Sequence, residues 1–212
     1  MRERGNHDLA VITAILDEGL LCHVGVNDAD TPVVTPMAYA RVDDHLYLHG
    51  AARNRTLRLI GGGAPACVTV TLLDALVFAR SAFHHSMNYR CVMLFGTGQA
   101  VRNDSEKQAA SRALLEHMAR GRASDARLPS PAELRATSIV RFPIEEGSAK
   151  IRTGGPKDDD GDLASPIWAG VLPVHLVVKR GIAEPDLPPD TETPAYALAY
   201  PVRPQKDRAR ST

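Results

Sequence analysis

The chain has 212 residues, and its 25 lysine and arginine residues balance its 25 aspartate and glutamate residues. A formal charge of zero leaves no overall field that would attract nucleic acid or an anionic membrane, so neither partner is expected. Hydrophobic residues make up 44% of the chain, yet no run approaches the roughly 18 apolar residues of a membrane span, so we expect a soluble protein.

A helix is predicted over residues 8–17, followed by short strands. Apolar Leu9, Ile12 and Ile15 recur at helical offsets, and Gly19 ends the pattern. The pattern then changes to short segments rich in Val, Leu and Tyr at residues 20–26, 32–42 and 45–50. The turn-forming sequences NDAD and DD separate them. They predict three antiparallel strands in a meander.

A short helix and two longer strands are predicted next. Residues 52–63 place Leu57 and Ile60 three positions apart and end in three glycines, which is typical of a short helix. The strands cover residues 65–80 and 89–101, and the first of them is expected to bend at Asp74.

The clearest helix is predicted at residues 103–121. Asn103 or Asp104 caps it, and an apolar stripe is expected at Ala110, Leu114 and Met118. A second short helix at residues 130–137 and a strand at 138–152 complete the pattern. This order predicts a mainly β fold with helical inserts, in which about six antiparallel strands form a closed or partly closed barrel.

The carboxyl-terminal segment differs in composition from the rest of the chain. Six prolines from residue 185 onward exclude a central strand or helix there, so we divide the chain into a domain over residues 1–182 and a proline-rich arm over 183–212. The basic end of the arm is expected to be loose. The acidic run KDDDGD at residues 157–162 lacks the spacing of a calcium loop and predicts a solvated loop.

Cysteine use and the amino terminus indicate a cytoplasmic protein. Cys22, Cys67 and Cys91 are three in number and show no C-x-x-C spacing, so neither a disulfide framework nor a zinc site is expected. The first residues show no apolar segment that leads to a secretory cleavage site.

A polar stretch, RSAFHHSMNYR, separates the two long strands and is too elaborate for a plain hairpin turn. His84 and His85 are adjacent and would point to opposite sides of an extended chain, so a zinc or dimetal site is not expected. The stretch is either a ligand-contacting loop or an exposed loop whose histidines are satisfied locally.

Two further features suggest an anionic, planar ligand. Arg53 and Arg55 stand at the predicted start of a helix, where guanidinium groups and free backbone N–H groups suit a phosphate, although a solvated basic face is the alternative. Just before them a strand ends at His49 and Gly50, where the backbone could approach a flat ligand closely.

These segments, from residue 32 to 60 and from 65 to 101, resemble the FMN-binding split-barrel proteins related to pyridoxamine 5'-phosphate oxidase. The narrower resemblance is to the branch that contains nitroimidazole-resistance reductases, and it covers about residues 8–175. It implies a six-stranded antiparallel split β-barrel that binds FMN as a homodimer. The strand that is Arg- and Lys-rich in the oxidase reads VVTPMA here, so pyridoxamine phosphate oxidation is not expected.

The resemblance also implies which residues contact the cofactor. The strand that lines the isoalloxazine corresponds to Thr35, Pro36, Met37 and Ala38, and the strand end beside the ring corresponds to His49, Gly50 and Ala51. The phosphate ligands correspond to Arg53 and Arg55. A further strand, from the same or the partner subunit, corresponds to Asn88, Tyr89 and Arg90. His84 and His85 would lie near the substrate as catalytic candidates.

Two functions follow. The first is an FMN-dependent oxidoreductase that passes hydride or electrons through flavin N5 to a small-molecule electron acceptor, a nitro or quinoid compound. The alternative is a non-catalytic flavin- or haem-binding protein, in which His49 or His84 would ligate iron. A purely structural or interaction protein, suggested by the arm, is a third possibility.

Overall fold

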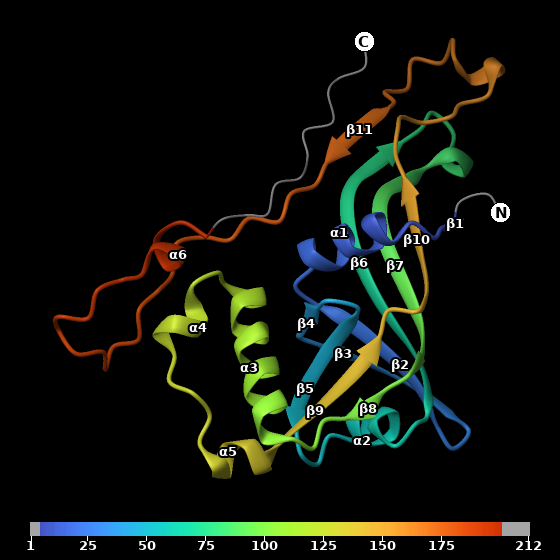
Figure 1. The fold of residues 1–212 in the computed structure, drawn as a ribbon. Helices are drawn as coiled ribbons and strands as arrows, with labels where there is room; N and C mark the ends of the chain where they lie inside the picture. Colours follow the sequence, from blue (N-terminus) through green and yellow to red (C-terminus); the bar gives the residue numbers. More distant parts are fainter. Residues whose placement is uncertain (1–4, 201–212) are drawn as a thin grey trace.

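The fold consists of two antiparallel sheets that share one core (Figure 1). The structure is a computed structural model that describes residues 5–200. The larger sheet has the strand order β1 (Gly5–Asn6), β10 (Glu146–Arg152), β7 (Ser86–Thr97), β6 (Pro65–Phe78), β2 (Cys22–Asp28) and β3 (Thr31–Met37), with β11 (Gly170–Pro173) also paired to β6. The smaller sheet has the order β4 (Tyr39–Val42), β5 (His45–Ala51), β9 (Thr137–Pro143) and β8 (Gln99–Ala100).

The core lies between the two sheets and beneath helix α1 (Leu9–Glu18). Ile12, Ile15 and Leu16 of this helix join one hydrophobic cluster with side chains of both sheets, such as Val68 and Phe142. Figure 1 shows α1 lying across the strands, and it contacts β6, β7 and β10 of the larger sheet and β4 of the smaller one. The predicted mainly β, antiparallel barrel with helical inserts is therefore confirmed.

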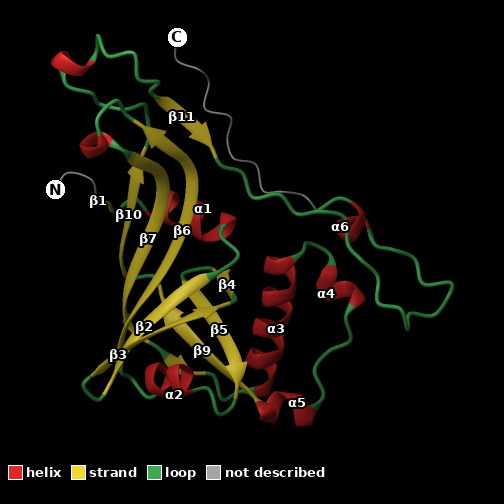
Figure 2. Ribbon diagram, turned by 180° about the vertical axis from the view of Figure 1, so that it is seen from behind, coloured by secondary structure: helices red, strands yellow, loops and turns green. Residues whose placement is uncertain are grey.

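The remaining helices lie beside the smaller sheet, at the ends of the barrel and, farther out, along the later segments of the chain (Figure 2). Side-chain caps start the longer ones, as the sequence predicts for α3, because each cap oxygen accepts a bond from a free backbone N–H group. The helices and short 3-10 turns are α2 (Arg55–Gly61), η2 (Ala82–His84), α3 (Asp104–Met118), α4 (Arg122–Asp125), α5 (Pro131–Ala136), η3 (Asp160–Asp162) and α6 (Ala195–Leu198). No helix among residues 5–200 is long and apolar enough to cross a membrane.

Two predicted strands are each divided between the sheets. The segment at residues 32–42 forms β3 in the larger sheet and β4 in the smaller one, and the segment at 138–152 forms β9 and β10 in the same way. The predicted three-strand meander is therefore wrong, because the chain changes sheet near Ala38. The two halves of each segment favour strand equally, so local composition does not mark the change.

The predicted stripe of helix α3 is wrong at its last member. Ala110 and Leu114 are buried, but Met118 is 52% exposed, and the inward position of the last turn belongs to His117. Two helical turns span about 7.2 residues, so His117, seven positions after Ala110, returns to the buried face more closely than Met118, eight positions after it. The Nε2 atom of His117 lies 2.7 Å from the carbonyl oxygen of Gly19, which ties α3 to the end of α1.

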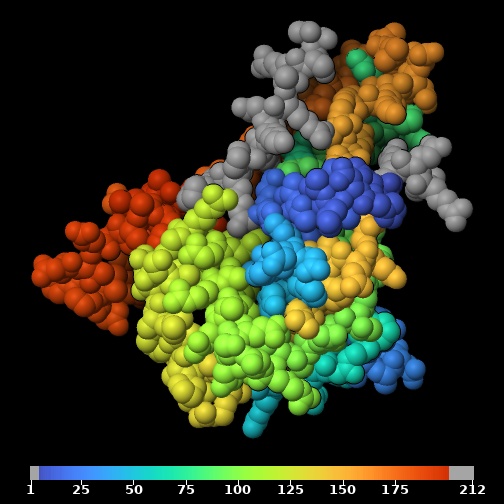
Figure 3. All heavy atoms as spheres, viewed as in Figure 1, coloured from blue at the N-terminus to red at the C-terminus, as the bar shows by residue number. Residues whose placement is uncertain are grey.

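The predicted bend in β6 is confirmed, whereas β11 was not predicted. The register of β6 against β7 shifts between Leu73 and Ala75, which places a bulge at Asp74. After β11 the arm extends along the molecule and returns to helices α3 and α4, as the red segment of Figure 3 shows. There the Tyr196 hydroxyl lies 2.9 Å from Oδ2 of Asp125, and the Tyr200 hydroxyl bonds to the carbonyl of Met118. The basic end predicted to be loose lies mainly outside the described residues.

Candidate functional site

The predicted cofactor-binding residues form two groups in one chain. The first group lies on β3, at the end of β5 and at the start of α2, and comprises Thr35, Pro36, Met37, Ala38, His49, Gly50, Ala51, Arg53 and Arg55. The second group lies at the β6–β7 hairpin and comprises His84, His85, Asn88, Tyr89 and Arg90.

Direct contacts hold the first group together. The hydroxyls of Thr35 and Thr56 lie 2.8 Å apart, which joins β3 to helix α2. Arg55 forms an ion pair with Asp28 at the end of β2, so its charge is already compensated. Arg53 is exposed, and no hydrogen bond or ion pair links its side chain to another described residue. Of the two predicted phosphate ligands, Arg53 is the one whose guanidinium is available.

His49 and Gly50 adjoin this arginine but differ in their surroundings. Burial lowers the pKa of His49, although more than a third of the residue remains exposed, so its neutral form is favoured near pH 7. A Cβ atom at Gly50 would lie 3.0 Å from Cδ1 of Leu57 and 3.4 Å from Nδ2 of Asn54. A side chain here would press on Leu57 and Asn54, so glycine favours the close packing of α2 on β5, in addition to any approach of a ligand.

Arg90 is held by two carboxylates. Its Nη2 atom lies 2.7 Å from Oε1 of Glu18 and 2.7 Å from Oδ1 of Asp74, and all three side chains are less than one-quarter exposed. These bonds, above all those to Glu18, raise the pKa of the guanidinium. Arg90 thus joins α1 to the bulge of β6, and its donors are occupied within the fold, so the geometry does not support its predicted role as a flavin ligand.

Asn88 and Tyr89 stand beside it on β7. Asn88 is buried, and its Nδ2 donates a hydrogen bond of 3.1 Å to the carbonyl of Gly154, while its Oδ1 accepts one from Arg152. Tyr89 is half-buried, and Lys150 Nζ lies 5.8 Å from the centre of its ring. Tyr89 therefore presents a partly accessible ring, whereas Asn88 fixes the segment after β10.

The loop over residues 81–85, here called the histidine tip, is bound to the acidic run. Arg80 binds Asp158 of that run. The backbone nitrogen and the Nη1 atom of Arg80 each lie 2.7 Å from a carboxylate oxygen of Asp158. These bonds, the backbone one foremost, lower the pKa of Asp158, whose side chain is only 2% exposed. Nε2 of His84 lies 3.2 Å from Oδ2 of Asp159. Most of the acidic run is therefore exposed, as predicted for a solvated loop, but the side chain of Asp158 is buried and binds Arg80.

The arginine end of the first group is far from the second group within one chain. Asp28, which binds Arg55, ends strand β2, and Val26 of that strand pairs with Ala66 of β6. Arg90 pairs with Leu72 and Ser86 with Val77, so the second group begins about 20 Å along β6 from this end and extends to about 36 Å, at roughly 3.3 Å per residue. Pro36 lies nearer, because it pairs with His23, which pairs with Thr69 of β6. Within one chain the arginine end of the first group therefore does not meet the histidine tip.

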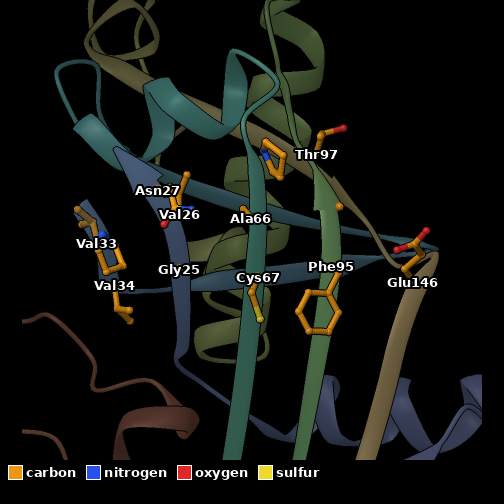
Figure 4. A pocket seen from close by; sticks show the side chains of 13 residues that line it. Gly25, Val26, Asn27, Val33, Val34, Ala66, Cys67, Phe95, Thr97 and Glu146 are labelled. Atoms are coloured by element: carbon orange, nitrogen blue, oxygen red, sulfur yellow. The ribbon is translucent and has the colours of Figure 1, made fainter. Parts of the chain in front are cut away.

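A groove that the sequence did not predict lies on the outer face of the larger sheet (Figure 4). It has a volume of about 480 Å³ and is lined by residues of β2, β3, β6 and β7, with Glu146 at one end. Val34 and Phe95 in its walls are 65% and 48% exposed. None of the predicted cofactor-binding residues lines it. Its signal in the sequence is weak, because Val34 and Phe95 are typical strand residues whichever face they occupy.

The described residues contain no group of three or more histidine, cysteine, aspartate or glutamate side chains placed to hold a metal ion. All three cysteines are free, and Cys22 is buried. Polar chemistry is thus concentrated at Arg53, at Tyr89 and at the histidine tip.

The fold agrees with the comparisons to known proteins. The family model described as "Pyridoxamine 5'-phosphate oxidase" matches residues 8–151. The chain therefore belongs to the pyridoxamine 5'-phosphate oxidase-like family, whose fold is the split β-barrel. The comparison with curated protein sequences gives no match.

Two similar solved structures extend over almost the whole chain. The flavocytochrome Anf3 from Azotobacter vinelandii is 35% identical, with 92% of this chain and 91% of that chain covered and a TM-score of 0.86. The FAD and haem binding protein from Mycobacterium smegmatis is 34% identical, with 91% and 95% covered and a TM-score of 0.86. A putative 5-nitroimidazole antibiotic resistance protein from Bacteroides thetaiotaomicron is 22% identical, with 69% and 86% covered and a TM-score of 0.59, which is a likeness of fold.

Proposed function

We propose that this chain is a flavin- and haem-binding redox protein that acts as a homodimer in the cytoplasm. The observation that carries the proposal is its similarity, at 35% and 34% identity over more than nine-tenths of the chain, to a flavocytochrome and to a protein described as binding FAD and haem. The free thiols of all three cysteines support the reducing compartment.

The first group of residues fits a flavin. Arg53 offers an unpaired guanidinium to a phosphate, Thr35 and His49 are polar groups beside it, and the backbone from Pro36 to Ala38 leaves the larger sheet at this point. The sequence predicts FMN, and the name of the relative from M. smegmatis favours FAD. We propose FAD, whose diphosphate would use the same cationic anchor.

Separation of the two groups supports the homodimer. Tyr89 and the histidine tip lie about 20 Å or more along β6 from the end of β2 that holds Arg55, too far for this arginine end and those side chains to contact one flavin within a chain. Paired copies related by a two-fold axis would place the first group of one opposite the second group of the other. The flavin would then lie between them, with Tyr89 supplied by the partner.

A bound flavin accepts or gives hydride and single electrons, and the protein orients it and excludes competing reactions. In this chain Arg53 would hold the phosphate, and neutral His49 would add no positive charge beside the ring. We propose a small nitro or quinoid compound as electron acceptor, with haem as a second redox centre. Non-catalytic binding of the same groups is the alternative that turnover decides.

The test is the absorbance spectrum of the purified full chain, before and after heat release of its ligands, with light scattering for its mass. We expect a flavin identified as FAD by chromatography, a Soret band after incubation with haemin, and a dimer. Anaerobic reduction followed by a nitro compound or a quinone should reoxidise the flavin. A colourless monomer that takes up neither group would overturn the proposal.

A further inference from the structure

The histidine tip carries an unusual concentration of exposed aromatic and apolar side chains. Phe83 is 89% exposed and Trp168, from the segment after the acidic run, is 63% exposed. Phe78 links the two sides, since its ring centre lies 5.6 Å from that of His85 and 6.2 Å from that of Trp168. Aromatic surface left open around an imidazole is costly in water unless a flat apolar ligand covers it.

His85 is held in one tautomer. Its Nδ1 lies 2.9 Å from the carbonyl oxygen of Ser81, and because a carbonyl only accepts, Nδ1 carries the hydrogen. Nε2 of the neutral ring then keeps its lone pair, and it makes no hydrogen bond with any residue the structure describes. An imidazole whose other N–H is fixed by a backbone carbonyl is the usual arrangement of a metal-binding histidine.

The other candidate histidines lack this arrangement. Nε2 of His84 faces the carboxylate of Asp159 at 3.2 Å, so Nε2 carries the hydrogen and is occupied, and the ring packs edge-on against Phe83. His49 has no carbonyl or carboxylate among the described residues that fixes its tautomer. His85 alone among these three presents a prepared lone pair to an aromatic surface.

Haem fits this tip better than a bare metal ion does. No second or third histidine, cysteine or carboxylate in residues 5–200 completes a ligand set around His85, whereas haem brings four nitrogen ligands of its own and needs one axial imidazole. The Nε atom of Arg80 and the hydroxyl of Ser81 are buried at the base of the tip without a hydrogen-bond partner within the described part of the chain. The charge of Arg80 is paired with Asp158, but these two unused donors would suit oxygen acceptors such as the carboxylates of haem.

We propose that His85 is an axial ligand of haem at the histidine tip, with Phe78 against its ring and Trp168 beyond Phe78 as its apolar surroundings. This rests on the proposed function and deepens it by naming the iron ligand. It also replaces two sequence-based assignments, namely His84 as the iron ligand of the haem-binding alternative and His85 as a group beside the substrate.

The test is titration of the full chain with haemin, read from the Soret band, with flavin content as an independent measure of folding. His85→Ala should weaken haem binding by more than about a hundredfold, and His85→Gln, which keeps the polar volume, should weaken it similarly. His84→Ala should remain within about threefold of wild type, because its ring is turned to Asp159. Added imidazole should restore a wild-type-like Soret band to His85→Ala by occupying the vacated place.

The outcomes separate the two proposals. Wild-type protein that binds flavin but no haem would overturn both the haem part of the proposed function and this assignment. Haem binding that survives His85→Ala with an unchanged Soret band, or that is lost in His84→Ala instead, would overturn the assignment of His85 alone.

Discussion

The Nη2 atom of Arg90 lies 2.7 Å from Oε1 of Glu18, and this ion pair joins the last turn of α1 to the middle of strand β7. The same guanidinium binds Asp74 at the bulge of β6. One cation thus neutralises two largely buried carboxylates that belong to separate elements. The stability of the fold should therefore depend more on this ion pair than on an ion pair at the surface.

Replacement of Arg90 by alanine should therefore destabilise the fold strongly. Two carboxylates would face each other without a cation, and we expect a loss of about 3 kcal/mol in the free energy of unfolding, measured by urea denaturation. Arg41→Ala is the control, because its partner Asp17 is 49% exposed and the loss should stay near or below about 1 kcal/mol. Equal losses in the two variants would contradict the central role of Arg90.

Tyr39→Phe tests how the end of α1 is fixed. The Tyr39 hydroxyl donates toward the carbonyls of Leu16, at 2.5 Å, and of Gly19, at 3.0 Å, inside the core. Loss of a donor to buried carbonyls should cost about 1 to 2 kcal/mol, visible as a lower midpoint of thermal or urea unfolding. Tyr47→Phe, which removes a bond to the partly exposed Glu106, should cost less. A larger loss of stability in Tyr47→Phe than in Tyr39→Phe would contradict this interpretation.

The thiol of Cys22 should make the fold sensitive to alkali. Burial raises the pKa of Cys22 to about 12, and the protonated thiol donates a bond of 3.3 Å to the carbonyl of Met37. In the unfolded chain the thiol ionises near its ordinary pKa, so its contribution is complete below about pH 9 and falls as the pH rises toward 12, by up to about 4 kcal/mol. Unfolding measured from pH 8 to 11 should show a steeper decline for wild type than for Cys22→Ala. Parallel curves would contradict this prediction.

Arg53 should anchor the phosphate of the proposed flavin. Loss of one charge-assisted contact costs about 1.5 to 3 kcal/mol, so Arg53→Ala should weaken FAD or FMN binding by about ten- to a hundredfold in a fluorescence titration. Riboflavin, which lacks the phosphate, should bind wild type and variant equally. Arg58→Ala, in the last turn of the same short helix, is the control. Unchanged affinity in Arg53→Ala would move the phosphate elsewhere.

The sequence identified most helices and strands because their signals are local. Asn103 at the start of α3 and the bulge at Asp74 are examples in which a cap or a polar residue within a strand marks the structure. The exchange of sheets at Ala38 has no such signal, since it depends on which strands the two halves meet. The position of His117 in place of Met118 was missed because its partner, Gly19, lies 98 residues away.

The candidate site shows the same limit. The resemblance gave the segments that carry Arg53 and the histidines, but not the bonds that commit Arg90 to Glu18 and Asp74 or Arg55 to Asp28. Those partners come from distant parts of the chain, and residue type alone does not distinguish a free guanidinium from a compensated one. The tautomer of His85 likewise depends on a turn whose geometry the sequence does not specify.

Strand β6 has a consequence for how the molecule avoids polymerising. On one edge it pairs with β7 along nearly its whole length. On the other edge its pairing with β2 stops at Thr69 and its pairing with β11 starts at Ala75, which leaves Val70 to Leu73 without a partner strand among residues 5–200. An open edge invites strands of other molecules. Here it is only a few residues long and stops at a bulge that carries Asp74, so an incoming strand would find too short a template and a charge at its end.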